Sequence, residues 1–134
     1  MTRARLLLAE DHAAVRNAAI QLLEQEFEVV GTAADGQSLI EAAARISPEV
    51  SVVDISMPVL NGIEAAQRLR ETGSTTRVVF LTTYEDLDYV QAALAAGALG
   101  YVVKSRMYTD LCPAIKEALA GRMFVSPFIA SGEI

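Results

Sequence analysis

The sequence predicts a parallel α/β sheet with helices on both faces. Short, continuous apolar runs, such as Leu6–Leu8 and Val78–Leu81, alternate with longer stretches in which apolar residues recur every three or four positions. Continuous apolar runs are typical of strands buried on both faces, and the longer spacing is typical of amphipathic helices. The alternation continues over most of the 134 residues, which indicates repeated strand–helix units in one domain.

Five strands and five helices can be placed along the chain. The first strand is expected over about 4–9 and the second from Phe27 to Ala33, with a helix between them. Asp35-Gly36 is a turn signal, and the helix expected after it ends before Pro48 because the residue preceding a proline disfavours helical backbone. The remaining strands are expected over about 50–54, 77–82 and 99–103. The remaining helices are expected from Ile63 to near Gly73, from Glu85 to Ala96, and over about 108–120.

Five such units favour a doubly wound, five-stranded parallel sheet of the flavodoxin-like (βα)5 class, with strand order 2-1-3-4-5. This order places the first and third strands side by side at the switch point of the sheet. Gly121 ends the last helix, and the alternation is lost beyond it. We therefore expect one domain over residues 1–121, with 122–134 as the start of an interdomain linker or a tail.

The composition disfavours several classes of protein. With a net charge of −6, the chain lacks the excess of lysine and arginine that contacts with nucleic-acid phosphates need. No apolar stretch approaches the roughly 20 residues of a membrane helix, and the run behind Arg3 and Arg5 is too short for a signal peptide. The single cysteine, Cys112, allows no internal disulfide and is expected to pack inside the last helix. These features predict a soluble, cytoplasmic protein without a membrane partner.

Reactive polar residues stand at the ends of four of the predicted strands. They are Glu10-Asp11 on the first strand, Asp54 on the third, Thr82 on the fourth and Lys104 on the fifth. Because ligands of open parallel sheets bind beyond the carboxyl ends of the strands, these side chains are expected to converge on one pocket. Carboxylates gather a hard cation, while a hydroxyl and an ammonium hold anionic oxygens. The set therefore predicts a magnesium-assisted phosphoryl site.

The ordered motifs resemble the receiver domain of two-component response regulators over nearly the whole chain. The matching motifs are Glu10-Asp11, Asp54-Ile55-Ser56-Met57-Pro58 with Asn61-Gly62, Leu81-Thr82, and Gly100-Tyr101-Val102-Val103-Lys104. An acid pair alone is a weak indication, whereas the full set in this order is specific. The segment around Thr82 and the ending from Gly121 to Pro127 are most similar to receivers joined to LuxR-type helix-turn-helix output domains.

The resemblance implies that Asp54 accepts a phosphoryl group from a sensor histidine kinase. A carboxylate is a suitable nucleophile when a metal neutralises the incoming group, and the acyl phosphate that forms is labile. Mg²⁺, or Mn²⁺ as a substitute, would be held by Glu10, Asp11, Asp54 and the backbone carbonyl of Ser56. Many receivers have Asp at the first position, so the longer Glu10 is expected to reach the metal through water. His12 is expected to be an exposed first-turn residue rather than a ligand.

The resemblance also implies roles for Thr82, Lys104 and Tyr101. Thr82 and Lys104 would bind the phosphoryl oxygens, with Thr82 favoured over Thr83 because it directly follows the apolar strand. Thr82 and Tyr101 would form the switch: the threonine is drawn toward the phosphoryl group, and the aromatic ring fills the space that it leaves. Tyr84, two residues beyond Thr82, would slow the loss of the phosphoryl group through its size.

The predicted function is that of a signalling phosphoacceptor rather than a turnover enzyme. The chain would catalyse its own phosphorylation and dephosphorylation, and DNA would be bound only by an output domain outside it. The mean hydropathy of +0.32, together with the helix faces that such a switch releases, also allows homodimerisation on phosphorylation. Two alternatives stay open: a stand-alone receiver, and a receiver-like module that signals by protein contacts without phosphorylation. A haloacid-dehalogenase-like phosphohydrolase is disfavoured, because Ser56 stands where its general acid–base Asp would be.

Overall fold

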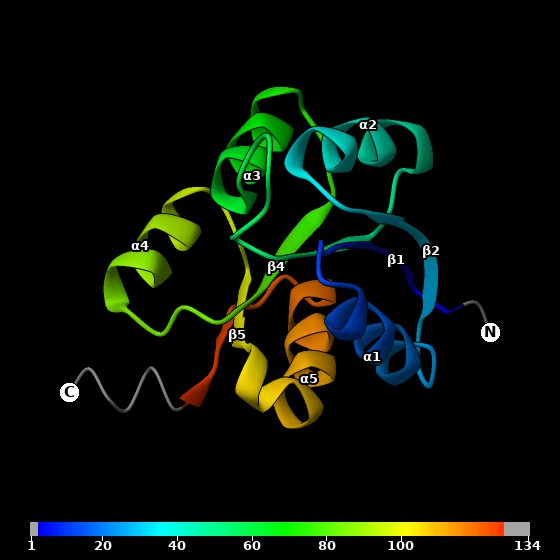
Figure 1. Cartoon of the computed structure of the whole chain (residues 1–134), viewed down its shortest axis with the longest axis vertical. Coiled ribbons are helices and arrows are strands. Elements are labelled where there is room, and N and C mark those ends of the chain that lie inside the picture. Colours follow the sequence, from blue (N-terminus) through cyan, green and yellow to red (C-terminus); the bar gives the residue numbers. More distant parts are fainter. Residues whose placement is uncertain (1–2, 128–134) are drawn as a thin grey trace.

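Helices cover both faces of a central parallel sheet in the computed structural model of the chain, which describes residues 3–127 (Figure 1). The strands are β1 (Arg5–Ala9), β2 (Glu28–Ala33), β3 (Val50–Val53), β4 (Arg77–Thr82), β5 (Gly100–Val103) and β6 (Phe124–Val125). The helices are α1 (Ala13–Leu23), α2 (Gly36–Ile46), α3 (Gly62–Glu71), α4 (Leu87–Ala95) and α5 (Met107–Leu119). A short 3₁₀ turn, η1 (Lys104–Arg106), connects β5 to α5. Within the described residues, no helix has the length and apolar character needed to cross a membrane.

The strand order is β2-β1-β3-β4-β5-β6, and all neighbouring strands are parallel. This confirms the predicted fold class and the order 2-1-3-4-5 of the first five strands. The sheet also has a sixth strand, which lies within the segment predicted as linker or tail: Phe124 and Val125 pair with Gly100 and Tyr101. Two residues are too few for an apolar run or an alternation to be recognised in a sequence. Residues 128–134 of the predicted tail lie outside the described residues.

The helix ends follow local signals in the sequence. Gly97 and Gly121, which come after α4 and α5, have φ angles of 98° and 76°, a left-handed conformation that glycine adopts at low cost. Helix α4 is shorter than predicted, because it begins at Leu87 rather than at Glu85. Helix α5 begins at Met107, one residue earlier than predicted, directly after η1. These differences leave the strand ends where the sequence placed them.

Two apolar layers, one on each face of the sheet, hold the helices. Because successive side chains of a strand point to opposite faces, Leu7 and Ala9 of β1 pack in the layer of α2, α3 and α4, whereas Leu6 and Leu8 pack in that of α1 and α5. Cys112 of α5 is buried in the second layer, as predicted. In Figure 1, α1 and α5 lie on one side of the sheet and α2 and α3 on the other. Burial of both faces fixes the residues that follow β1, β3, β4 and β5 at one edge of the sheet.

Candidate functional site

Two buried carboxylates meet at the carboxyl edge of the sheet. Glu10 follows β1 and Asp54 follows β3, and these strands are neighbours in the sheet. Glu10 is 1% exposed and Asp54 2%, while the side chain of Asp11 is 29% exposed at the rim. Ligand atoms of these three acids and one of His12 all lie within 4.8 Å of one another. The acids that the sequence places at strand ends therefore do form a cluster.

The ammonium group of Lys104 faces this cluster. Its Nζ lies 2.9 Å from Oε1 of Glu10 and 3.2 Å from Oδ2 of Asp54, to which it donates a hydrogen bond. The contact with Glu10 lacks the angles of a hydrogen bond, so Oε1 is a buried oxygen that has this ion-pair partner but no hydrogen-bond donor among residues 3–127. One ammonium group therefore serves two buried carboxylates.

Charge in this cluster is compensated only in part. Burial, and then repulsion from Glu10, raise the pKa of Asp54 to about 6, although Lys104 opposes the change. Burial disfavours the charged form of Lys104, but its contacts with Glu10 and Asp54 outweigh this and raise the pKa of the ammonium group. With all groups ionised, the carboxylates of Glu10, Asp11 and Asp54 against one ammonium group leave two net negative charges. A divalent cation would relieve the repulsion between the carboxylates.

The donor set fits a hard divalent cation. Mg²⁺ prefers oxygen ligands in octahedral geometry and keeps several waters, so two or three carboxylates are sufficient to hold it. The close approach of the acidic oxygens is consistent with such a site, as is the buried Oε1 of Glu10, whose partner within the described part of the chain is an ion pair and not a hydrogen bond. Ligation by the carbonyl of Ser56, and a water between Glu10 and the metal, stay predictions.

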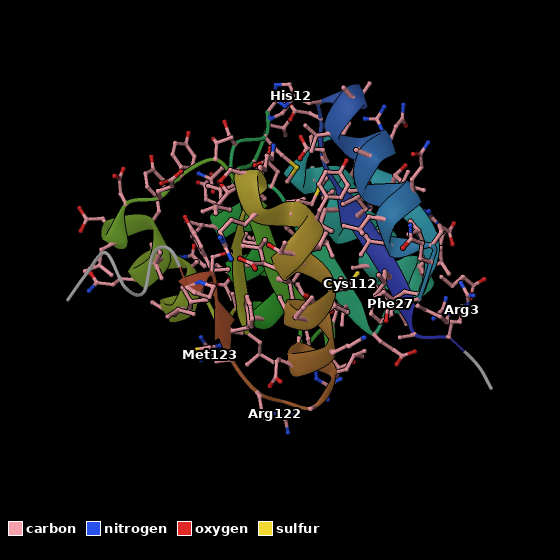
Figure 2. The ribbon with its side chains drawn as sticks, turned by 90° about the horizontal axis from the view of Figure 1, so that it is seen from below. Arg3, His12, Phe27, Cys112, Arg122 and Met123 are labelled. Atoms are coloured by element: carbon pink, nitrogen blue, oxygen red, sulfur yellow. The ribbon has the colours of Figure 1, made fainter. Side chains whose placement is uncertain are left out.

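His12 contributes to the cluster in a way that sequence analysis missed. Its side chain is 66% exposed, as predicted, and lies at the surface beside the start of α1 (Figure 2). Its Nδ1 nevertheless lies 3.2 Å from Oε2 of Glu10 and 3.3 Å from Oδ1 of Asp11, and its backbone N–H donates to Oε2 of Glu10 at 3.1 Å. Glu10 is therefore contacted from both sides, by Lys104 and by His12.

A tight loop after β3 presents Asp54. The backbone N–H of Ser56 donates to Oδ1 of Asp54 at 3.3 Å, and the N–H of Gly62 donates to the carbonyl of Ile55 at 2.8 Å. A Cβ atom on Gly62 would lie 2.3 Å from the carbonyl oxygen of Asp54, so a larger residue would displace the loop. The capping box that begins α3 at Asn61 fixes the far end of this loop. The backbone that carries Asp54 is thus held by its own neighbours.

Thr82 and Tyr101 both point into the protein. Thr82 ends β4 and is fully buried, and its Oγ1 accepts a hydrogen bond from the N–H of Tyr84 at 3.2 Å, whereas Thr83 is exposed. Tyr101 is fully buried in β5, and its hydroxyl donates to the carbonyl of Tyr84 at 2.8 Å. Tyr84 itself stacks on Tyr89, with ring centroids 4.0 Å apart. The segment after Thr82 therefore connects the two residues that are predicted to form the switch.

Residues 6–116 match the family model of the response regulator receiver domain. The chain belongs to this family. The transcriptional regulatory protein YvfU of Bacillus subtilis is 35% identical over 125 residues, which are 92% of this receiver and 62% of YvfU. The nitrate/nitrite response regulator NarL of Escherichia coli is also 35% identical over 125 residues, which are 92% of this receiver and 58% of NarL.

Solved structures show the same relationship. A LuxR-family two-component response regulator from Aurantimonas superimposes with a TM-score of 0.92 at 34% identity, over 97% of this receiver and 94% of that chain. The receiver domain of a NarL regulator from Mycobacterium tuberculosis gives a TM-score of 0.87 at 27% identity, over 91% of this receiver and 100% of that domain. These findings confirm the resemblance to LuxR-type receivers. The chain spans about three fifths of the length of the curated relatives that it matches.

A second pair of buried polar groups in this receiver was not found from the sequence. Asp110 lies in α5 and Ser126 directly follows β6, and the hydroxyl of Ser126 donates to Oδ2 of Asp110 at 2.8 Å. Asp110 is 4% exposed and Ser126 is 0% exposed. No motif or periodicity relates the two positions, because their contact depends on the pairing of β6 with β5.

Proposed function

We propose that this receiver takes a phosphoryl group from a sensor histidine kinase onto Asp54, in the presence of Mg²⁺. The position of Asp54 carries the proposal: it is a buried carboxylate at a strand end, in contact with an ammonium group and close to two further acids. Buried carboxylates that only support a fold are normally surrounded by hydrogen-bond donors. Among residues 3–127, the hydrogen-bond donors to Asp54 are the N–H of Ser56 and the ammonium group of Lys104.

The transfer needs Asp54 in its ionised form. A carboxylate oxygen of Asp54 forms a bond to phosphorus while the bond from phosphorus to the donor's imidazole nitrogen breaks, and the nitrogen keeps the electron pair. Glu10, Asp11, Asp54 and the Ser56 carbonyl would hold Mg²⁺, or Mn²⁺ in its place, and the cation would supply positive charge to the transferring oxygens. Burial and repulsion from Glu10 raise the pKa of Asp54 and so disfavour its ionised form. Positive charge from the cation would stabilise that form.

Lys104 and Thr82 would then hold the product. When the phosphoryl group is attached to Asp54, the Lys104 ammonium would exchange its contact with the carboxylate for one with a phosphoryl oxygen. The Thr82 hydroxyl would break its hydrogen bond with the N–H of Tyr84 and donate to another phosphoryl oxygen. Tyr101 would then move into the space that Thr82 leaves. Attack by water in the same pocket would return the carboxylate, so the receiver would catalyse both its phosphorylation and its dephosphorylation.

The full protein would be a transcriptional regulator. The relatives named as regulators extend beyond the region that matches this receiver, and the solved Aurantimonas protein is of the LuxR family. We therefore propose that phosphorylation controls a LuxR-type DNA-binding output domain, with homodimerisation as part of the switch. The same role implies a cytoplasmic location, and the free thiol of Cys112 is consistent with a reducing compartment.

Intact-mass spectrometry after incubation with acetyl phosphate and Mg²⁺ tests the phosphoacceptor. The expected result is one labile phosphoryl adduct on the wild type, absent from Asp54→Asn and from a sample with EDTA. If the wild type gives no adduct, the next test is binding of beryllofluoride, an analogue of the phosphoryl group. Binding would indicate a receiver that does not react with small-molecule phosphodonors, and no binding would indicate one that is not phosphorylated. Failure of both would favour signalling by protein contacts alone.

A further inference from the structure

Ser126 is a buried polar residue that the proposed chemistry does not use. It follows β6 directly and makes three hydrogen bonds. Its backbone N–H donates to the carbonyl of Tyr101 at 2.9 Å, and its Oγ accepts from the N–H of Val103 at 3.2 Å. The same Oγ donates to Oδ2 of Asp110 at 2.8 Å. Ser126 therefore touches the β5 residue immediately before Lys104 and the tyrosine predicted to be part of the switch.

Asp110 extends this contact to the other side of Lys104. Its carboxylate accepts hydrogen bonds from Nε of Arg106 at 2.8 Å and from Oγ1 of Thr109 at 3.1 Å, as well as from Ser126. Burial would raise the pKa of Asp110, but these hydrogen bonds outweigh burial and lower it, so the group stays ionised. Arg106 is the last residue of η1, the turn that begins with Lys104. The residue before the lysine is thus held through its backbone N–H, and the residue two positions after it through its side chain.

A buried, fully paired network of this kind resists small displacements. Moving Ser126 away would leave the buried Val103 N–H without its partner and would remove one of the two donors, Ser126 Oγ and Arg106 Nε, that bond Oδ2 of Asp110. The Lys104 ammonium must lie between Glu10 and Asp54, which it contacts at 2.9 and 3.2 Å. Its placement depends on the backbone of β5 and η1, which Ser126 bonds directly in β5 and Asp110 contacts through the Arg106 side chain in η1.

We propose that Ser126 is a positioning residue for Lys104, and that it couples the phosphorylation site to the chain that follows β6. The inference rests on the proposed function, in which Lys104 binds the phosphoryl group. A change at Lys104 would then alter the hydrogen bonds of Ser126, and a change in the segment after β6 would alter the affinity of the site, because such coupling is reciprocal. Regulation of an output domain connected through this segment would use the same contacts.

Beryllofluoride affinity in the presence of Mg²⁺ tests the positioning role. Ser126→Ala should weaken binding about fivefold or more, in the range typical of coupling between sites. Ser105→Ala, which alters an exposed serine of η1, is the matched control and should leave the affinity within twofold. In a Lys104→Met background, Ser126→Ala should have no further effect, because no ammonium group remains to be positioned. A role in stability alone would lower the melting temperature in both backgrounds and leave the affinity unchanged, which would overturn the proposal.

Hydrogen exchange of the wild type provides a second measurement that needs no variant. Beryllofluoride should change the protection of the amides of Val103 and Ser126, which both lie in this network. Unchanged protection of these amides in a protein that binds beryllofluoride would contradict the coupling while leaving the phosphoacceptor intact. Absence of binding to the wild type, together with absence of an acetyl phosphate adduct, would instead overturn the proposed function and this inference with it.

Discussion

Asp54 and Asp110 are both carboxylates with 4% exposure or less, yet their surroundings differ. Asp54 shares one ammonium group with Glu10, and burial together with the second carboxylate raises its pKa to about 6. Burial acts on Asp110 as well, but hydrogen bonds from three side chains outweigh it and hold the pKa of Asp110 below its ordinary value. The hydrogen-bond donors around Asp110, and the second carboxylate beside Asp54, therefore separate a carboxylate that stabilises the fold from one that is available for a metal and a phosphoryl group.

Removing the carboxylate of Asp110 should have the largest effect on stability. Asp110→Ala leaves the buried Ser126 hydroxyl without its acceptor and removes the partner of the partly exposed Arg106, so we expect the free energy of unfolding to fall by about 2–3 kcal/mol. Urea denaturation measures this change. Asp88→Ala, at an exposed position in α4, is the control and should stay within about 0.5 kcal/mol of the wild type. An Asp110→Ala protein as stable as this control would show that the network contributes nothing.

Removing the ammonium group of Lys104 should have the largest effect on phosphorylation. Lys104→Met deletes the ammonium group that contacts both Glu10 and Asp54, and we expect phosphorylation by acetyl phosphate to slow by about 100-fold. The rate can be followed by intact mass. Lys116→Met removes an exposed lysine of α5, which pairs with Glu26, and should leave the rate unchanged. A Lys104→Met rate within threefold of the wild type would rule out this role for the lysine.

The raised pKa of Asp54 should make stability depend on pH in metal-free buffer. Between the ordinary value of 3.8 and the folded value of about 6, the folded state binds more protons than the unfolded state. The free energy of unfolding contributed by Asp54 should therefore fall by about 2 kcal/mol as the pH rises from 4.5 to 7. Denaturation of the wild type and of Asp54→Asn across this range isolates the contribution. Parallel curves for the two proteins would contradict the assignment.

The smallest expected effect concerns the switch tyrosine. Tyr101→Phe removes the hydrogen bond to the carbonyl of Tyr84 and should lower the free energy of unfolding by about 1 kcal/mol. Thermal unfolding monitored by circular dichroism would detect it. Tyr108→Phe changes an exposed hydroxyl of α5 and should leave the melting temperature unchanged. Equal melting temperatures for the two variants would mean that the buried hydroxyl does not hold Tyr101 inward.

Much of the fold could be predicted because each central strand is a continuous apolar run that ends in a polar residue. The same feature identified Glu10, Asp54 and Lys104, since parallel strands bring their carboxyl ends to one edge of the sheet. The strand Phe124–Val125 was missed because two residues carry no periodicity. The contact of His12 with the acids was missed because an exposed residue at the start of a helix gives no sign of the direction of its ring.

The Asp110 network could not be predicted for a different reason. Its members are separated by up to 23 residues, from Val103 to Ser126, and no pattern of residue types distinguishes a buried serine from one in a linker. Their contact appears only when β6 pairs with β5 and places Ser126 over the start of α5. Sequence analysis therefore recovered the carboxylate whose partners lie at strand ends and missed the one whose partners depend on tertiary packing.

The most direct test of this account is chemical denaturation of Asp54→Asn and Asp110→Asn beside the wild type, at pH 7 without metal. The two substitutions remove the same charge from two buried positions, so the result reports how well the surroundings of each position stabilise that charge. The account predicts opposite signs: Asp54→Asn should raise the free energy of unfolding, and Asp110→Asn should lower it. Destabilisation by both variants would contradict it, because Asp54 would then be as well satisfied in the fold as Asp110.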